Sequence, residues 1–214
     1  MLRLWGRPSA FNVQKALWLL HELALDFEHI NVGGDAGGLD SPEFLARNPH
    51  GRIPVIDDDG VVVWESNTVL RYLAATYGGE SLWSDDPVKR ARWEGWMDWG
   101  LADLQRDFLD LFWGFYRTPA PDRNPALVAN RTERCKRHFE LLNRWLAERE
   151  WLAGDRFSLA EIPSGTTLFR YFNIEVERPA VPHVERWYAQ LQTRPAFQQA
   201  IMVPFSELFG KVDF

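Results

Sequence analysis

The chain has 214 residues and a mass of 24.9 kDa, a size that fits one or two domains. Hydrophobic residues make up 46% and charged residues 25%, as in a soluble globular protein with a substantial core. The formal net charge of −6 argues against a nucleic-acid partner, because such a protein needs a basic face to neutralise phosphates. The single cysteine, Cys135, excludes an intramolecular disulfide, a CxxC redox pair and a cysteine-rich zinc site. No stretch of about 18 consecutive apolar residues is present, so we expect no membrane span and a cytoplasmic location.

Residues 1–80 alternate short apolar runs with helical patterns. Strands are predicted at 2–5 and 27–32, with an amphipathic helix at 11–25 between them. Two further strands, 54–56 and 61–64, flank Asp57-Asp58-Asp59-Gly60 and predict a hairpin, and a helix over 66–77 follows. Ser41 and Pro42 indicate the start of a short helix. The order βαβ, then ββα, predicts a small mixed sheet with helices on its faces.

Strand patterns disappear after the polar segment 81–87. Helices are predicted over 88–116, 125–150, 159–172, 183–192 and 196–202. We therefore predict an α/β domain over 1–80, a linker over 81–87 and an all-helical domain over 88–214. Ser158 followed by Glu161 predicts a capping box, with Phe157 and Ile162 as its hydrophobic staple.

Pro54 opens a predicted strand, where its missing N–H removes a ladder hydrogen bond. If the Ile53–Pro54 bond is cis, the Ile53 backbone turns outward and offers its N–H and C=O to a peptide-like ligand. An ordinary edge-strand proline is the alternative, and it is the commoner case for a proline taken alone.

Glu65 and Ser66 lie at a predicted strand-to-helix junction. In the simplest interpretation Ser66 is the N-cap of the helix. The helix N-terminus also suits a carboxylate, and the Glu65 side chain suits an ammonium. Together they predict a receptor for an α-amino acid head group, and Arg52 and His50 are candidates for holding a second carboxylate.

A turn at residues 6–12 joins the first strand to the first helix. Ser9 either caps that helix or, with Asn12 and the helix dipole, stabilises the thiolate of a ligand. Lowering the pKa of a thiol below about 8.5 makes it a nucleophile at neutral pH.

The order of these motifs resembles the cytosolic glutathione transferases. The motifs are the Ser/Asn turn, Asn48-Pro49-His50-Gly51-Arg52-Ile53-Pro54, Glu65-Ser66, and the segment 154–162, which is similar to the family's capping segment. Phrases such as Leu4-Trp5-Gly6-Arg7 and Trp96-Met97-Asp98-Trp99 are most similar to bacterial members of theta-like or nu-like type. The resemblance implies a thioredoxin-like domain followed by a helical domain, assembled as a homodimer.

The resemblance also implies how glutathione is bound and used. Its cysteinyl backbone would pair with Ile53 beside Pro54, its γ-glutamyl end with Glu65 and Ser66, and its glycyl carboxylate with Arg52 or His50. The thiolate, held by Ser9 or Asn12, would attack a small hydrophobic electrophile in a detoxification reaction. The catalytic serine of serine-type members aligns with Arg7, so Ser9, Asn12 and Arg7 stay open as thiol activators.

The electrophile pocket is predicted from five aromatic residues, Phe11, Phe108, Phe112, Trp113 and Tyr116. No metal is expected, since the histidines lack metal-ligand spacing. Two other functions stay open: glutathione-dependent reduction of a disulfide or peroxide, and non-catalytic binding on the same fold. The aromatic load predicts a homodimer in which the helices 66–77 and 88–116 pack against their equivalents. The family resemblance implies that an acidic residue of the helix over 88–116 then reaches the partner's site: Asp98 is the first candidate, and Asp103 and Asp107 on the same helix stay open.

Overall fold

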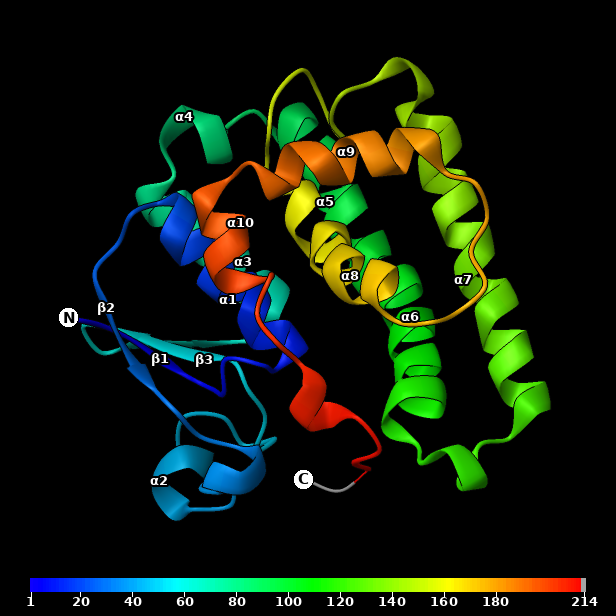
Figure 1. Cartoon of the computed structure of the whole chain (residues 1–214). Helices are drawn as coiled ribbons and strands as arrows, with labels where there is room; N and C mark the ends of the chain where they lie inside the picture. The colour runs from blue at the N-terminus through cyan, green and yellow to red at the C-terminus, as the bar shows by residue number, and fades with distance from the viewer. Residues whose placement is uncertain (213–214) are drawn as a thin grey trace. The chain divides into compact units, whose positions relative to one another are not determined.

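The computed structural model describes residues 1–212, which divide into two compact units (Figure 1). The first unit comprises Met1–Asp85 together with Ala196–Val203. The second comprises Asp86–Pro195 and residues 204–212. The segment 196–203, which the sequence groups with the helical half, therefore belongs with the N-terminal unit. The domain limits drawn from the sequence stay a prediction.

The first unit is built on a four-stranded mixed sheet in the order β2-β1-β3-β4. Its strands are β1 (Leu2–Trp5), β2 (Phe27–Ile30), β3 (Val55–Asp58) and β4 (Val61–Trp64). β1 pairs with β2 in parallel, and both β1–β3 and β3–β4 are antiparallel. This arrangement confirms the small mixed sheet that the sequence predicts.

The hairpin turn is tighter than predicted, because Asp57 and Asp58 belong to β3. Only Asp59 and Gly60 form the turn, with φ of 47° and 96°. Positive φ at both positions is typical of a two-residue turn that matches the strand twist. The Asp57 carboxylate accepts a hydrogen bond from the Gly60 amide at 2.7 Å, which explains why an Asp-rich run fits here.

Helices cover both faces of this sheet. In Figure 1, α1 (Phe11–Glu22) and α3 (Ser66–Tyr77) lie on one face and α2 (Pro42–Leu45) lies on the other. The start of α2 is as predicted: Ser41 Oγ accepts from the Phe44 amide at 3.2 Å, with Pro42 in the first turn. The short helices η1 (Gly34–Ala36) and α4 (Gly79–Leu82) complete the unit with part of α10 (Pro195–Ala200).

The regular elements of the second unit are all helices within its described residues. The predicted long helix over 88–116 is a continuous helical stretch with two π-helical turns. It consists of α5 (Pro87–Trp99), η2 (Gly100–Gln105), α6 (Arg106–Leu111) and η3 (Phe112–Arg117). The remaining helices are η4 (Ala120–Asp122), α7 (Pro125–Trp145), η5 (Leu146–Glu148), α8 (Glu161–Asn173), α9 (Pro182–Gln192) and η6 (Ser206–Leu208).

The predicted capping box takes a different form at the start of α8. The N-cap is Ala160, and Ser158 Oγ accepts from the Ala160 amide at 3.3 Å. The Glu161 carboxylate accepts from the Leu152 amide and the Trp187 indole, and it also forms a side-chain hydrogen bond with Ser158. Glu161 is completely buried, so it ties three separate segments of the unit together.

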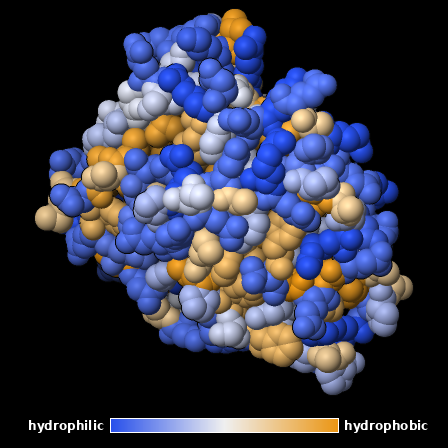
Figure 2. All heavy atoms as spheres, turned by 45° about the horizontal axis from the view of Figure 1, so that its top comes forward, coloured by the Kyte–Doolittle hydropathy of each residue, from blue (hydrophilic) through white to orange (hydrophobic). Residues whose placement is uncertain are grey.

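Hydrophobic side chains also reach the surface, as the patches in Figure 2 show for one face. Trp113, Trp145 and Leu141 are among the exposed large apolar residues. Within residues 1–212, none of the helices has the length and apolar character needed to cross a membrane.

Candidate active site

Three chain segments meet at one edge of the N-terminal sheet, and strand register explains why. β1 and β3 pair so that Trp5 lies opposite Val55, and β3 and β4 pair so that Val55 lies opposite Trp64. The residues that follow Trp5, precede Val55 and follow Trp64 therefore share this edge. They include the turn before α1, the Ile53–Pro54 pair, and Glu65 with Ser66, all of which the sequence predicts as site residues.

Close packing holds the first two segments together. Gly6 has φ of 150°, and a Cβ at this position would lie 2.4 Å from Val13 and 3.4 Å from the Ile53 Cβ. A residue with a side chain would thus collide with α1. The glycine lets the end of β1, the start of α1 and the Ile53 loop approach one another.

The peptide bond between Ile53 and Pro54 is cis. The Ile53 side chain packs with the cluster of Trp5, Phe44 and Val55. Its backbone N–H and C=O have no hydrogen-bond partner among the described residues. An extended peptide can pair with such an unused amide and carbonyl in the manner of an added strand.

Glu65 and Ser66 form the second part of the edge. α3 begins at Ser66, so its N-cap is Glu65 and the prediction of Ser66 as N-cap is wrong by one residue. Glu65 has φ of 68°, and its exposed side chain makes no capping bond. Its carboxylate is accessible, and the N–H groups of the first turn of α3 lie beside it.

The loop from Asn48 to Arg52 is organised by buried Asn48. Its Nδ2 donates to the Arg52 carbonyl at 2.7 Å, and its Oδ1 accepts from the His50 amide at 3.1 Å. The His50 ring lies 5.3 Å from the ring of Trp64, and the Arg52 side chain is exposed. Two groups that can be cationic thus stand next to the Ile53 backbone.

The turn before α1 contains the candidate thiol activators. Its backbone closes through a hydrogen bond from the Ala10 amide to the Arg7 carbonyl at 3.0 Å. Ala10, and not Ser9, is the N-cap of α1. Asn12 lies in the first turn of α1, where its Oδ1 is 3.5 Å from Ser66 Oγ. Asn12 is therefore tied to the edge formed by Glu65 and Ser66.

Sequence patterns do not single out Lys15, which is completely buried in α1. Burial lowers the pKa of Lys15 to about 7, and the charge of Glu65 acts in the opposite direction. Hydrophobic periodicity does not predict this burial, because lysine is rarely buried and Gln14 beside it is a second buried polar residue of α1.

In the second unit, three of the predicted pocket residues, Phe108, Phe112 and Tyr116, form an aromatic cluster. Phe112 stacks on Tyr116 with ring centroids 5.0 Å apart, and Phe108 lies 5.9 Å from Phe112. Tyr116 also contacts Phe205, at 5.1 Å. Phe108 and Phe112 are buried, and Tyr116 is half-buried.

Trp113 is 41% exposed, and the Arg117 guanidinium lies 3.5 Å from its ring centroid, apart from that stack. Phe11, the fifth predicted pocket residue, is buried at the start of α1 in the first unit. Burial raises the pKa of Cys135 to about 12, so this thiol is inert. Within residues 1–212, no three His, Cys, Asp or Glu side chains are grouped so that they could hold a metal ion.

Comparison with known proteins agrees with this geometry. The family model described as "Glutathione S-transferase, N-terminal domain" matches residues 1–75, and the corresponding C-terminal domain matches residues 105–195. Glutathione S-transferase GstB of Escherichia coli K12 is 38% identical over 208 residues, which cover 96% of this chain and all of that protein. Glutathione S-transferase 3 of Zea mays is 31% identical, covering 94% of this chain and 93% of the maize protein.

A solved structure shows the same fold along nearly the whole chain. It is the theta class glutathione S-transferase of Xanthomonas axonopodis pv. citri with glutathione bound, 39% identical with a TM-score of 0.90. The alignment covers 95% of this chain and 98% of the Xanthomonas chain. These findings confirm the predicted fold class, a thioredoxin-like domain with a helical domain, and the family resemblance: the chain belongs to the glutathione S-transferase family.

Proposed function

We propose that this protein is a glutathione transferase that binds glutathione at the sheet edge formed by Ile53, Glu65 and Ser66. The observation that carries the proposal is an unpaired Ile53 backbone beside an exposed carboxylate and a helix N-terminus. A tripeptide with an α-amino acid head needs these three elements: main-chain partners, an anion for its ammonium, and N–H donors for its carboxylate. The glutathione-bound structure of the Xanthomonas relative supports this choice of ligand.

Each end of glutathione has a partner in this proposal. The cysteinyl N–H and C=O pair with the C=O and N–H of Ile53, next to Pro54. The γ-glutamyl ammonium binds Glu65, and its carboxylate accepts from Ser66 and the first turn of α3. The glycyl carboxylate binds Arg52 or His50, which follow Asn48 in the ordered loop.

The reaction that follows is a nucleophilic displacement or addition. The thiol loses its proton to solvent, and its thiolate accepts a hydrogen bond from Ser9 or Asn12 at the positive end of α1. The thiolate sulfur then forms a bond to an electrophilic carbon. In a displacement a leaving group departs with its electron pair, and in an addition the electron pair of the attacked double bond takes up a proton from solvent. Arg7 stays a third candidate for the activator.

The electrophile is a small hydrophobic molecule. Support comes from the aromatic cluster of Phe108, Phe112 and Tyr116, since apolar lining with few polar groups is typical of ligand pockets. Phe11 and Trp113 complete the predicted set. Phe112, Trp113 and Tyr116 all belong to the π-helical turn η3, and such turns occur often at functional sites.

The physiological role that we propose is detoxification of such electrophiles in the cytoplasm by a homodimer. Family membership supports this role, and apolar grooves around Trp96 in the second unit support the dimer.

Calorimetry of glutathione binding tests the site. Glu65→Gln should weaken binding at least about tenfold, because it removes a charge-assisted hydrogen bond to the ammonium. Glu43→Gln, a similarly exposed change on α2, is the control and should bind as the wild type does. Equal affinities of wild type and Glu65→Gln would contradict the site assignment.

The thiol activator is identified with a separate measurement. In Ser9→Ala and Asn12→Ala, the pH dependence of kcat/KM for a chloronitroaromatic substrate reports the pKa of the bound thiol. The variant in which this pKa rises toward about 8.5 has lost the activator.

A further inference from the structure

His29 is a residue of β2 that the proposed mechanism leaves unused, although its ring contacts the turn before α1. Its Nε2 lies 2.7 Å from the carbonyl oxygen of Gly6. A carbonyl oxygen only accepts hydrogen bonds, so Nε2 carries a proton and donates it, which fixes the tautomer of the neutral ring. Gly6 directly precedes Arg7 and lies three residues before Ser9, two of the candidate thiol activators.

β2 holds Gly6 by both of its backbone polar groups. The register of β1 with β2 ends where Trp5 lies opposite Ile30, and the Gly6 amide then donates to the Ile30 carbonyl at 3.0 Å. Beyond the end of this register, the His29 side chain donates to the Gly6 carbonyl. Because peptide units are planar, these two bonds fix the peptide planes on either side of Gly6 relative to the sheet. The second plane contains the amide of Arg7, where the turn begins.

The direction of the turn depends on the backbone of Gly6. Its φ of 150° is favoured by glycine, and glycine has wide backbone freedom unless contacts restrict it. The residues that follow are closed into a turn by the bond from the Ala10 amide to the Arg7 carbonyl at 3.0 Å. A rotation at Gly6 would therefore move residues 7–10 together, and with them Ser9 and the start of α1. The bond from His29 opposes that rotation.

We infer that His29 is a positioning residue for activation of the glutathione thiol: by holding the Gly6 carbonyl, it fixes the turn that presents the thiol activator. This inference rests on the proposed function. The tripeptide itself is proposed to bind Ile53, Glu65 and Ser66, which flank β3 and β4 and do not depend on this bond. Loss of the bond should therefore change the ionisation of the bound thiol and leave the affinity for the tripeptide unchanged.

The exposure of His29 sets the size and the place of the effect. Because the residue is exposed, its hydrogen bond adds little to the stability of the whole unit and acts on the turn locally. A single hydrogen bond of this kind changes an equilibrium by about threefold to tenfold. The pKa of the bound thiol should therefore rise by about 0.5 to 1 unit without it. The neutral ring with its proton on Nε2 and the protonated ring both donate to the carbonyl, so the bond persists when His29 itself titrates.

The pH dependence of kcat/KM for a chloronitroaromatic substrate at saturating glutathione tests this role. The amide nitrogen of glutamine takes the place of Nε2 and that of asparagine the place of Nδ1, so His29→Gln keeps a donor for Gly6 and His29→Asn does not. His29→Asn should raise the thiol pKa by about 0.5 to 1 unit. Its kcat/KM should fall about threefold to tenfold at pH 6.5 and stay within about twofold of the wild type at pH 9.

Two variants serve as controls. His29→Gln should restore the wild-type pH profile. His21→Asn removes the other histidine ring that contacts Phe27 and should also keep that profile. A loss of folded enzyme would lower kcat/KM by the same factor at both pH values, so the pH profile separates positioning from a structural defect.

The outcomes separate this inference from the proposed function. A thiol pKa in His29→Asn within about 0.2 unit of the wild-type value, or equal losses at both pH values, would overturn the role of His29. Calorimetry with S-methylglutathione, which has no ionisable thiol, should show His29→Asn and wild type binding within about twofold of each other. A wild type that binds neither S-methylglutathione nor glutathione would overturn the proposed function instead.

A measurement on the wild type decides the question if circular dichroism shows that His29→Asn does not fold. Long-range proton–nitrogen correlation spectra identify which ring nitrogen of a histidine carries the proton. At pH 8.5, where an imidazole is neutral, His29 should carry it on Nε2. A proton on Nδ1 would mean that Nε2 cannot donate to the Gly6 carbonyl, and the inference would fall.

Discussion

Glu161 is the residue at which burial and hydrogen bonding oppose each other most clearly. Its carboxylate accepts from the Leu152 amide at 3.1 Å and from the Trp187 indole at 3.0 Å. Burial nevertheless raises the pKa of Glu161 to about 8. An unfolded glutamate has a pKa of about 4.3. The folded protein therefore holds more protons than the unfolded chain between these values, and this contribution to stability falls as pH rises through the window.

Replacing Glu161 should remove that pH dependence. In the wild type, Glu161 should make the free energy of unfolding fall by about 3 kcal/mol between pH 5.5 and pH 8, and Glu161→Gln should lack this fall. The variant should also be less stable at pH 5.5, because an amide nitrogen accepts no hydrogen bond, whereas both oxygens of the protonated Glu161 carboxyl can accept from the Leu152 and Trp187 N–H groups. Urea unfolding at both pH values measures this, with the exposed Glu150→Gln as control. An unchanged pH slope in Glu161→Gln would refute the role given to its titration.

At the scale of elements, local sequence patterns predict the elements well and their partners less well. The four strands, the helix over 66–77 and the site segments follow from alternation, turn chemistry and motif order. The prediction that Ser66 is the N-cap of α3 is wrong because Glu65 takes this position, with a positive φ. Glutamate has no local preference for that conformation, so the sequence does not predict it. The burial of Lys15 and the placement of 196–203 in the first unit depend on contacts between residues far apart in the sequence. Hydrophobic periodicity carries no information on such contacts.

Residues 196–203 illustrate such a contact and lead to a prediction. Phe197 is fully buried and meets the ring of Trp18 edge-on, with centroids 4.8 Å apart. Phe197→Ala should lower the free energy of unfolding by about 3–5 kcal/mol, because it leaves a cavity against α1. Phe209→Ala, at a 61% exposed position, should cost less than about 1 kcal/mol. Denaturant unfolding compares the two, and equal losses would show that 196–203 does not stabilise the first unit.

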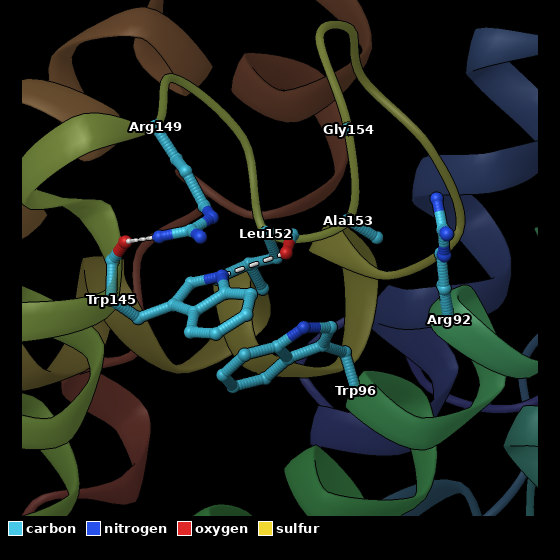
Figure 3. A pocket seen from close by; sticks show the side chains of 7 residues that line it. All are labelled: Arg92, Trp96, Trp145, Arg149, Leu152, Ala153 and Gly154. Atoms are coloured by element: carbon cyan, nitrogen blue, oxygen red, sulfur yellow. Dashed lines mark hydrogen bonds between the residues drawn. The ribbon is translucent and has the colours of Figure 1, made fainter.

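At the scale of the whole molecule, the second unit carries a surface suited to a second copy of the chain. A groove of about 300 Å³ is lined by Arg92, Gly95, Trp96, Trp99 and Leu141. An adjoining pocket has a volume of about 400 Å³ and is also lined by Arg92 and Trp96. In it the ring centroids of Trp96 and Trp145 are 5.2 Å apart, and the side chains of Arg92 and Arg149 lie on either side of them (Figure 3). Tryptophan and arginine are enriched in protein interfaces. Residues 1–80 carry 11 acidic and 6 basic residues, so a second copy offers charge that complements these arginines.

The homodimer that we propose can be broken at Gly95 without disturbing the fold of one chain. A Cβ at Gly95 would meet nothing within 4 Å, and this glycine lies inside α5, so arginine fits and gains about 0.5–1 kcal/mol of helix propensity. Its long cationic side chain would fill the groove beside Arg92 and prevent docking. Sedimentation at micromolar concentration should show wild type at twice the 24.9 kDa chain mass and Gly95→Arg at the chain mass. Ala129→Arg, at an exposed position on α7, should stay dimeric.

In the dimer Asp98, also on α5, is proposed to reach the partner's γ-glutamyl end, so Gly95→Arg should bind glutathione more weakly. An active wild-type monomer would refute the dimer and this contact together, whereas a dimeric Gly95→Arg would refute only the groove as its interface.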